Sequence, residues 1–177
     1  MMEKKTILDM GRDTLETYRA KKKIPLTIVL DNIRSLNNIG SIFRTSDAFR
    51  VERLMLCGIT ATPPSVEIHK TALGAEDSVR WEYRPSSTEA ARELRREGYT
   101  LCALELAKGS VSLENFPVDC NGRRYAVVVG HEVDGVSQGV LDLCDHCIEI
   151  PQEGTKHSLN VAVSTALAIW HFYLKLR

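Results

Sequence analysis

Short apolar runs rich in β-branched residues recur along the chain, and segments with helical spacing separate most of them. The clearest runs are PLTIVLD (25–31), RLMLCG (53–58), GYTLCALEL (98–106) and RYAVVVG (124–130), with weaker strands expected at 79–84 and 146–150. Their length and unbroken apolar character are typical of strands buried on both faces. Strands that alternate with helices in this way favour a mainly parallel sheet flanked by helices. We therefore predict one α/β domain.

The helices are expected at 9–23, 38–50, 87–97, 137–143 and 159–176, with a looser, turn-rich segment at 59–78. A polar side chain at the start of a helix accepts a hydrogen bond from an unpaired amide of the first turn. The candidate caps are Asn38, Ser87 or Thr88, and, for the last helix, Ser158. The last helix carries no formal charge from 161 to 174 when its histidine is neutral. We expect it to be buried on nearly every side.

The composition is that of an ordinary globular chain. Of 177 residues, 44% are hydrophobic and 26% are charged, and Lys plus Arg equals Asp plus Glu at 23 each. This balance gives no indication of a nucleic-acid partner, but a local basic patch can still bind phosphates. No apolar run reaches the roughly 20 residues that a membrane span needs. The N-terminal segment also lacks the apolar core of a signal peptide, so we expect no membrane partner.

The cysteine pattern predicts a reducing environment. Five cysteines at irregular spacing indicate free thiols and a cytoplasmic location. The closest approach to a motif is CDHC, from Cys144 to Cys147. A single C-x-x-C without a second pair is a weak indication of a metal site, and this one runs into an expected strand. We interpret it as structural and expect no metal.

Polar residues gather directly after three of the expected strands. DNIRSLNN follows 25–31, GHEVDG follows 124–130, and PQEGTKHSLN follows 146–150. Ligands of open parallel sheets bind outside the carboxyl ends of the strands. Because those ends meet at one edge of the sheet, the three clusters are expected to converge on a single site.

The first cluster leads into a helix that carries Arg44. Helical spacing places Arg44 with Ser41 and Ala48 on one face, opposite the apolar side chains at 39, 42 and 43. A guanidinium that rises from small neighbours can reach a planar anion such as a phosphate. The alternative is a solvated arginine paired with Asp47 or Glu52. Nearby Gly40 is a position where another backbone can approach closely.

The second cluster places Gly130 and Gly135 around the carboxylates Glu132 and Asp134. It is neither a P-loop nor a dinucleotide fingerprint, because the required glycines and lysine are absent and the carboxylates would repel a pyrophosphate. An acidic loop at a strand end suits a cationic or hydroxyl-bearing ligand. The alternative is an ordinary solvated turn.

The third cluster contains Pro151 and Gly154, which allow a sharp turn against the sheet. Amides exposed by such a loop can bind a flat ring, while Ser158 and Asn160 supply polar groups beside it. From these residues alone we predict a pocket for a small ligand beside an arginine that can reach an anion.

Three segments together resemble a known family. NNIGSIFRTSDAF, VVVGHEVDGVS and IEIPQEGTKHSLNVAVSTALAIW are similar, in order and spacing, to the signature motifs of the SpoU (TrmH-like) branch of the SPOUT RNA methyltransferases. The resemblance runs from about Thr27 to Phe172. It implies S-adenosylmethionine (SAM) as methyl donor, a ribose 2′-hydroxyl of tRNA or rRNA as acceptor, a homodimer, and a C-terminal trefoil knot that general topology rules would not predict. On this basis residues 25–177 form the methyltransferase domain and 1–24 an N-terminal extension.

The resemblance also implies roles for individual residues. The positions matched to catalysis are Asn38, Arg44, Glu132, Ser158 and Asn160. The positions matched to the cofactor are Leu104, Glu105, Gly130, Gly135, Ile150, Pro151, Ser158 and Leu159. With so short an N-terminal extension, we expect RNA to meet the catalytic domain or its dimer mate, together with Arg44 and the basic residues Arg19, Lys21, Lys22 and Lys23.

Family proposals treat the first-motif arginine as the base that activates the hydroxyl. A guanidinium is effectively never deprotonated in proteins, so we expect Arg44 to grip the adjoining phosphate and orient the ribose. The long apolar helix is expected to serve the knot and the dimer interface. Two alternatives remain open: an inactive RNA-binding or assembly module of the same fold, and a SPOUT enzyme that methylates a base.

Overall fold

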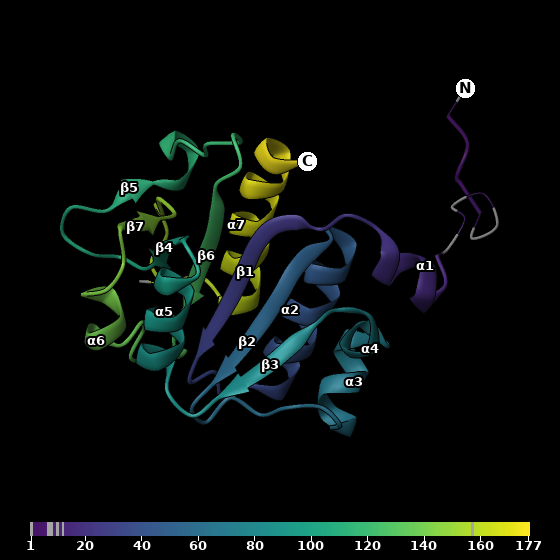
Figure 1. The fold of residues 1–177 in the computed structure, drawn as a ribbon, viewed down its shortest axis with the longest axis horizontal. Coiled ribbons are helices and arrows are strands. Elements are labelled where there is room, and N and C mark those ends of the chain that lie inside the picture. Colours follow the sequence, from purple (N-terminus) through teal and green to yellow (C-terminus); the bar gives the residue numbers. More distant parts are fainter. Residues whose placement is uncertain (1, 7–8, 10, 12, 157) are drawn as a thin grey trace.

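A computed structural model describes residues 2–6, 9, 11, 13–156 and 158–177. In this part of the chain, seven strands form one sheet in the order β3-β2-β1-β6-β4-β7-β5, and all neighbouring strands are parallel (Figure 1). The strands are β1 (Ile24–Asp31), β2 (Val51–Cys57), β3 (Trp81–Arg84), β4 (Tyr99–Leu104), β5 (Val111–Ser112), β6 (Arg124–Val129) and β7 (His146–Glu149). The predicted parallel α/β architecture is confirmed.

Helices cover both faces of this sheet. They are α1 (Leu15–Ala20), α2 (Leu36–Ala48), α3 (Val66–Ala72), α4 (Ala75–Ser78), α5 (Ser87–Arg96), α6 (Gln138–Leu141) and α7 (Val161–Leu176), with a 3-10 helix, η1 (Leu113–Asn115). Residues of α2, α3 and α7 share one hydrophobic core with the sheet. Residues of α5 and α6 form a second core on the opposite face (Figure 1).

The central strands are apolar without interruption because both of their faces are buried. In β1, Ile28 and Leu30 face the core beneath α2 and α7, while Val29 faces the core beneath α5. In the neighbouring β6, Val127 and Val128 divide between the two cores in the same way. A strand covered on both sides therefore loses the alternation of polar and apolar residues that marks a half-exposed strand.

Two predictions about helices in the first half of the chain were wrong. The N-terminal helix does not begin near residue 9: α1 begins at Leu15, where the Thr14 side chain accepts a hydrogen bond from the Thr17 amide. The segment 59–78, predicted to be turn-rich, holds α3 and α4. These helices have only seven and four residues, too few for a periodic apolar pattern to be recognised.

All three predicted helix caps were wrong by one to three residues. Ser35, rather than Asn38, caps α2, and Ser86 caps α5. Asn160, rather than Ser158, caps α7, and its Oδ1 accepts the amides of the first turn at 2.9 and 3.3 Å. The side chains of Asn38 and Ser158 are therefore not needed to cap helices.

The sequence predicted that helix α7 would be buried on nearly every side. Within the single chain, only one of its faces is buried. One face packs into the core through Val161, Thr165, Ala168, Ile169 and Phe172. The other face carries an exposed apolar stripe, spaced by three or four residues: Val163, Leu167, Trp170 and Leu174. Within the described residues, no helix has both the length and the apolar character to cross a bilayer.

Candidate functional site

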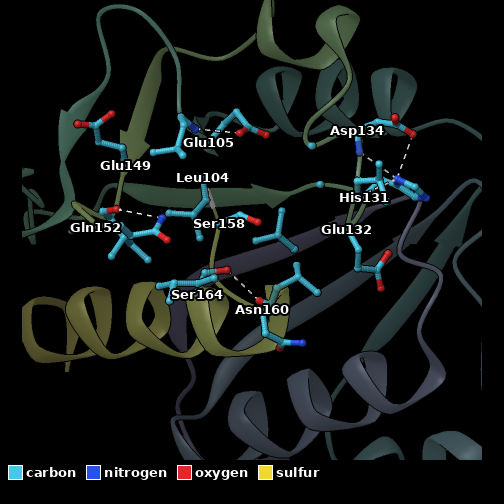
Figure 2. Close-up of a pocket in the computed structure, with 18 residues that line it drawn as sticks. Leu104, Glu105, His131, Glu132, Asp134, Glu149, Gln152, Ser158, Asn160 and Ser164 are labelled. Carbon is cyan, nitrogen blue, oxygen red and sulfur yellow. Dashed lines mark hydrogen bonds and ion pairs between the residues drawn. The ribbon is translucent and has the colours of Figure 1, made fainter. Parts of the chain in front are cut away.

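A cavity of about 500 Å³ opens at the carboxyl ends of β4, β6 and β7, beside the start of α7 (Figure 2). Its lining combines the end of β4, the whole loop from Gly130 to Gly135, and the segment before α7. Most of the predicted cofactor-binding positions line it: Leu104, Glu105, Gly130, Gly135, Ile150, Ser158 and Leu159. Pro151 does not line it.

The loop after β6 folds into a tight hairpin that requires glycine at both ends. His131 and Gly135 exchange two backbone hydrogen bonds of 3.0 and 2.9 Å. A Cβ atom on Gly130 would lie 2.1 Å from backbone atoms of Gly135 and Val136. Gly135 has a φ of +70°, and a Cβ there would lie 2.1 Å from the Glu105 carboxylate. The two glycines therefore let the hairpin close against the end of β4.

Two carboxylates fix the end of this hairpin to the sheet. Glu105 accepts the Val136 amide at 2.8 Å and the Leu106 amide at 2.9 Å. Asp31, at the end of β1 and 1% exposed, accepts the next amide of the loop, that of Ser137, at 2.9 Å. Consecutive amides are thus tied to two different strands. Asp31 begins the first polar cluster, DNIRSLNN, but it was not singled out from the sequence, and its bond to the hairpin was not predicted.

Glu132 joins the hairpin to the loop before α2. Its carboxylate accepts the amides of Arg34 and Ser35 at 3.0 and 2.9 Å and the Asn38 side-chain amide at 3.2 Å. Partial burial raises the pKa of Glu132, but these donors favour the ionised form more strongly and hold the pKa below its ordinary value. Glu132 therefore acts as an anionic acceptor for its neighbours.

Asn38 and Asn160 complete the connection between the three clusters. The Asn160 Nδ2 donates to the Asn38 Oδ1 over 3.1 Å, while its Oδ1 caps α7. A continuous chain of hydrogen bonds therefore runs from Glu132 through Asn38 to Asn160. The predicted convergence of the three clusters is confirmed, and Glu132 and Asn160 are also at the rim of the cavity (Figure 2).

Arg44 lies on the exposed face of α2, outside the cavity lining. It is six residues beyond Asn38, which corresponds to roughly 9 Å along a helix. Neither suggested partner binds it: Asp47 accepts a hydrogen bond from Ser78, and Glu52 pairs with Arg124 at 2.9 Å. Within the described residues, the Arg44 guanidinium has no hydrogen bond or ion pair.

The basic N-terminal segment lies at the amino end of β1, away from the carboxyl ends that form the cavity. Arg19 donates to the Asp77 carbonyl at 2.6 Å, and Lys21 pairs with Asp13 at 2.6 Å. Lys23 stacks over the Tyr18 ring at 3.3 Å, and its burial lowers its pKa. Of the predicted RNA-binding cluster 19–23, three cations thus have intramolecular partners. Its role in RNA binding stays a prediction.

Several cavity residues escaped sequence reasoning. They are Leu106, Val129, His131, Val133, Glu149, Gln152, Val161 and Ser164. His131 and Val133 belong to GHEVDG, so the cluster itself was the signal, but only its carboxylates and glycines were singled out. Gln152 belongs to the third cluster, PQEGTKHSLN, but was not singled out, and Glu149 is the last residue of β7, where the rule about strand ends applies.

The two cysteines of CDHC are free thiols. Burial raises the pKa of Cys144 to about 12 and also raises that of Cys147. Thiols of this kind are weak nucleophiles at neutral pH, which favours the structural interpretation. Within the described residues, no group of three His, Cys, Asp or Glu side chains is placed to hold a metal ion.

The chain is similar in sequence and fold to known RNA-modifying proteins. The model of the SpoU rRNA Methylase family matches residues 25–170. The chain belongs to this family. A protein of Staphylococcus haemolyticus named as a TrmH family tRNA/rRNA methyltransferase is 27% identical over 161 residues, which are 91% of this chain and 63% of that protein. The chain therefore spans less than two thirds of that relative's length.

Solved structures of RNA-modifying enzymes have the same fold as this chain. The AdoMet-bound rRNA methyltransferase of Sinorhizobium meliloti superposes with a TM-score of 0.80 at 25% identity, covering 90% of this chain and 60% of that one. The TrmH/SpoU tRNA modifying enzyme of A. aeolicus gives a TM-score of 0.79 at 26% identity, covering 91% and 81%. The family resemblance predicted from the three motifs is confirmed.

Proposed function

We propose that this chain transfers a methyl group from SAM to a ribose 2′-hydroxyl of tRNA or rRNA. The observation that carries the proposal is the hydrogen-bonded chain Glu132–Asn38–Asn160, which joins all three motifs at the rim of the cavity. Family membership and the SAM-bound relative support the methyl donor. The spacing of Asn38 and Arg44 and the SLN sequence at 158–160 favour ribose over a base.

The cavity fits SAM in size and chemistry. Its volume of about 500 Å³ lies within the usual range of roughly 300–1,000 Å³ for small-molecule sites. Backbone groups of the hairpin and of the segment before α7 suit an adenine ring, and the lining carboxylates suit a cationic ligand. When bound, SAM supplies a methyl group on a sulfonium that is its own leaving group. The protein then has to align the acceptor oxygen with that methyl group.

The residues around the cavity divide this work. Arg44 is free to bind the phosphate beside the target ribose and to stabilise developing charge on the 2′-oxygen. Asn38 and Asn160 hold the loops in register and present amide groups to the ribose. Glu132 fixes Asn38 and the loop before α2. Ser158, next to Asn160 in the lining, adds a hydroxyl at the same rim.

The exposed stripe on α7 supports a homodimer. Four large apolar side chains at helical spacing, between 42% and 51% exposed, form one continuous face. Contiguous apolar surface of this kind is commonly covered by a partner. We place residues 25–177 in the methyltransferase domain and 1–24 in an N-terminal extension, and we propose a cytoplasmic location. The C-terminal trefoil knot stays a prediction from the family.

Methyl transfer from labelled SAM to separate tRNA and rRNA pools that lack modifications tests this function. We expect label to enter one pool and not the other. Binding of SAM and RNA without any transfer would instead support the inactive RNA-binding module. A catalytically impaired variant, described below for Arg44, provides the negative control for contaminating activity.

A further inference from the structure

His131 has an unusual set of neighbours within the hairpin. Its ring lines the cavity, and the side chain is 14% exposed. The Nδ1 atom accepts hydrogen bonds from the amides of Val133 and Asp134, both at 3.2 Å. The same atom lies 3.1 Å from the Asp134 carboxylate. Figure 2 shows His131, Glu132 and Asp134 together at one end of the cavity, away from Glu149 and Gln152.

This arrangement accommodates either neutral tautomer of the imidazole. In the tautomer with its proton on Nε2, Nδ1 accepts the two amides. In the tautomer with its proton on Nδ1, that proton faces the Asp134 carboxylate at 3.1 Å, and Nε2 carries a free lone pair. Within the described residues, Nε2 has no hydrogen-bond partner. The tautomer with its proton on Nδ1 is therefore the one that can accept a proton from a ligand at Nε2.

Methylation of a hydroxyl requires a group that accepts its proton, and the other charged groups at the cavity are poorly suited to this. Glu132 is held ionised by three donors, and its lowered pKa makes it a weak base. Glu105 accepts two backbone amides. Glu149, from β7, accepts a hydrogen bond from Ser110 at 2.5 Å.

Asp134, the remaining carboxylate, is 82% exposed and contacts His131. Arg44 cannot serve, since a guanidinium remains protonated. Histidine is also the side chain that most often exchanges protons in enzymes at neutral pH. His131 is therefore the group at the cavity that remains available to take a proton.

We propose that His131 is the proton acceptor for the ribose 2′-hydroxyl, with Asp134 as the residue that positions and stabilises it. This inference rests on the proposed function. The reacting tautomer carries its proton on Nδ1, which donates to Asp134. As the bond from the 2′-oxygen to the methyl carbon forms and the methyl–sulfur bond breaks, the hydroxyl proton moves to the free Nε2. Asp134 then stabilises the imidazolium through the same Nδ1–H. Solvent removes the proton after the product leaves.

The test separates two roles of His131: holding the loop amides through Nδ1 and taking a proton at Nε2. His131→Asn keeps an acceptor near the Nδ1 position for the two amides, as asparagine does in Asx turns, but it removes Nε2. His69→Asn is the matched control, because His69 is exposed and pairs with Glu76 outside this cavity. SAM affinity by calorimetry and RNA affinity by fluorescence anisotropy accompany single-turnover methylation between pH 6 and about 9.5.

We expect His131→Asn to bind SAM and RNA like the wild type and to methylate roughly 100-fold more slowly or worse at neutral pH. Its residual rate should rise about tenfold per pH unit, as hydroxide replaces the missing base. The wild type should instead reach a plateau. If His131→Asn does not fold, Asp134→Asn decides: it keeps the imidazole, and we expect about a tenfold loss of rate.

A His131→Asn rate within twofold of wild type across the pH range overturns the inference, and so does an unchanged Asp134→Asn rate if the first variant cannot be folded. In both cases a wild type that still forms 2′-O-methylated nucleoside leaves the proposed function intact. A wild type that methylates no ribose overturns the proposed function and this inference with it.

Discussion

Substitution of Gly130 by alanine tests the hairpin that forms one wall of the cavity. The added Cβ would lie 2.1 Å from the Gly135 carbonyl carbon and from the Val136 amide nitrogen. Ordinary contact begins near 3.4 Å, so the hairpin must move by about 1.3 Å, the difference between these distances. Both opposing atoms belong to the backbone and cannot rotate away. The strain must therefore displace the whole loop.

That displacement threatens four hydrogen bonds. Two connect His131 with Gly135 at 3.0 and 2.9 Å. The others tie Val136 to Glu105 at 2.8 Å and Ser137 to Asp31 at 2.9 Å. At about 1 kcal/mol each, losing half or all of them lowers the free energy of unfolding by about 2–4 kcal/mol. For a chain of this size, the melting temperature should fall by about 5–15 °C.

The measurements are thermal unfolding followed by circular dichroism and SAM binding followed by calorimetry. We expect Gly130→Ala to lose at least about tenfold in SAM affinity, equivalent to roughly 1.4 kcal/mol. Gly154→Ala is the matched control, because a Cβ there meets nothing within 4 Å. A Gly130→Ala protein with the melting temperature and SAM affinity of the control would refute the reasoning.

Three further outcomes follow from the site. Arg44→Ala should slow single-turnover methylation about 100-fold with SAM binding intact, whereas the exposed Arg92→Ala should not; equal rates would remove Arg44 from the mechanism. Leu167→Asp, on the α7 stripe, should convert a dimer to a monomer in light scattering, and Val66→Asp should not; a monomeric wild type would contradict this. Because folding lowers the Glu132 pKa, its stabilising effect is present above the ordinary value of 4.5 and is lost as pH falls through the folded value. Glu132→Gln should therefore lower the melting temperature at pH 7 by a few degrees, and this loss should become smaller as the pH is lowered below 4.5; a loss that does not change with pH would show that ionisation is unimportant.

The sheet was predictable because its central strands are buried on both faces. Short continuous apolar runs such as 25–31 and 124–130 are typical of strands in a parallel sheet that helices cover on both faces. The boundaries of the helices were less predictable. The caps Ser35, Ser86 and Asn160 stand beside other polar residues, and local sequence does not determine which side chain reaches a first-turn amide.

The location of the site was predictable, but its internal connections were not. Parallel strands bring three polar loops to one edge, so the convergence of the loops followed from topology. The bonds from Glu132 to Asn38 and from Asn38 to Asn160 join residues 94 and 122 positions apart, and no local pattern encodes such pairs. The bond from the Ser137 amide to Asp31, 106 positions earlier, is of the same kind.

The sequence predicted an interface role for the last helix from the family resemblance, but its residues alone did not show which face is exposed in the single chain. An uncharged helix can be buried within one chain or covered by a second chain, and the sequence of the helix is the same in both cases. The structure separates the two, because Ile169 and Phe172 are fully buried while Leu167 and Trp170 remain exposed.

The central claim is that the methyl group reaches a ribose oxygen. Mass spectrometry of nucleosides from the methylated RNA pool tests this most directly, because fragmentation separates the base from the sugar. The account predicts that the labelled methyl group stays with the ribose when the wild-type protein is used. Arg44→Ala should add far less label to the same RNA in the same time. A label that stays with the base would contradict it and would place the chain among base-methylating enzymes of this fold.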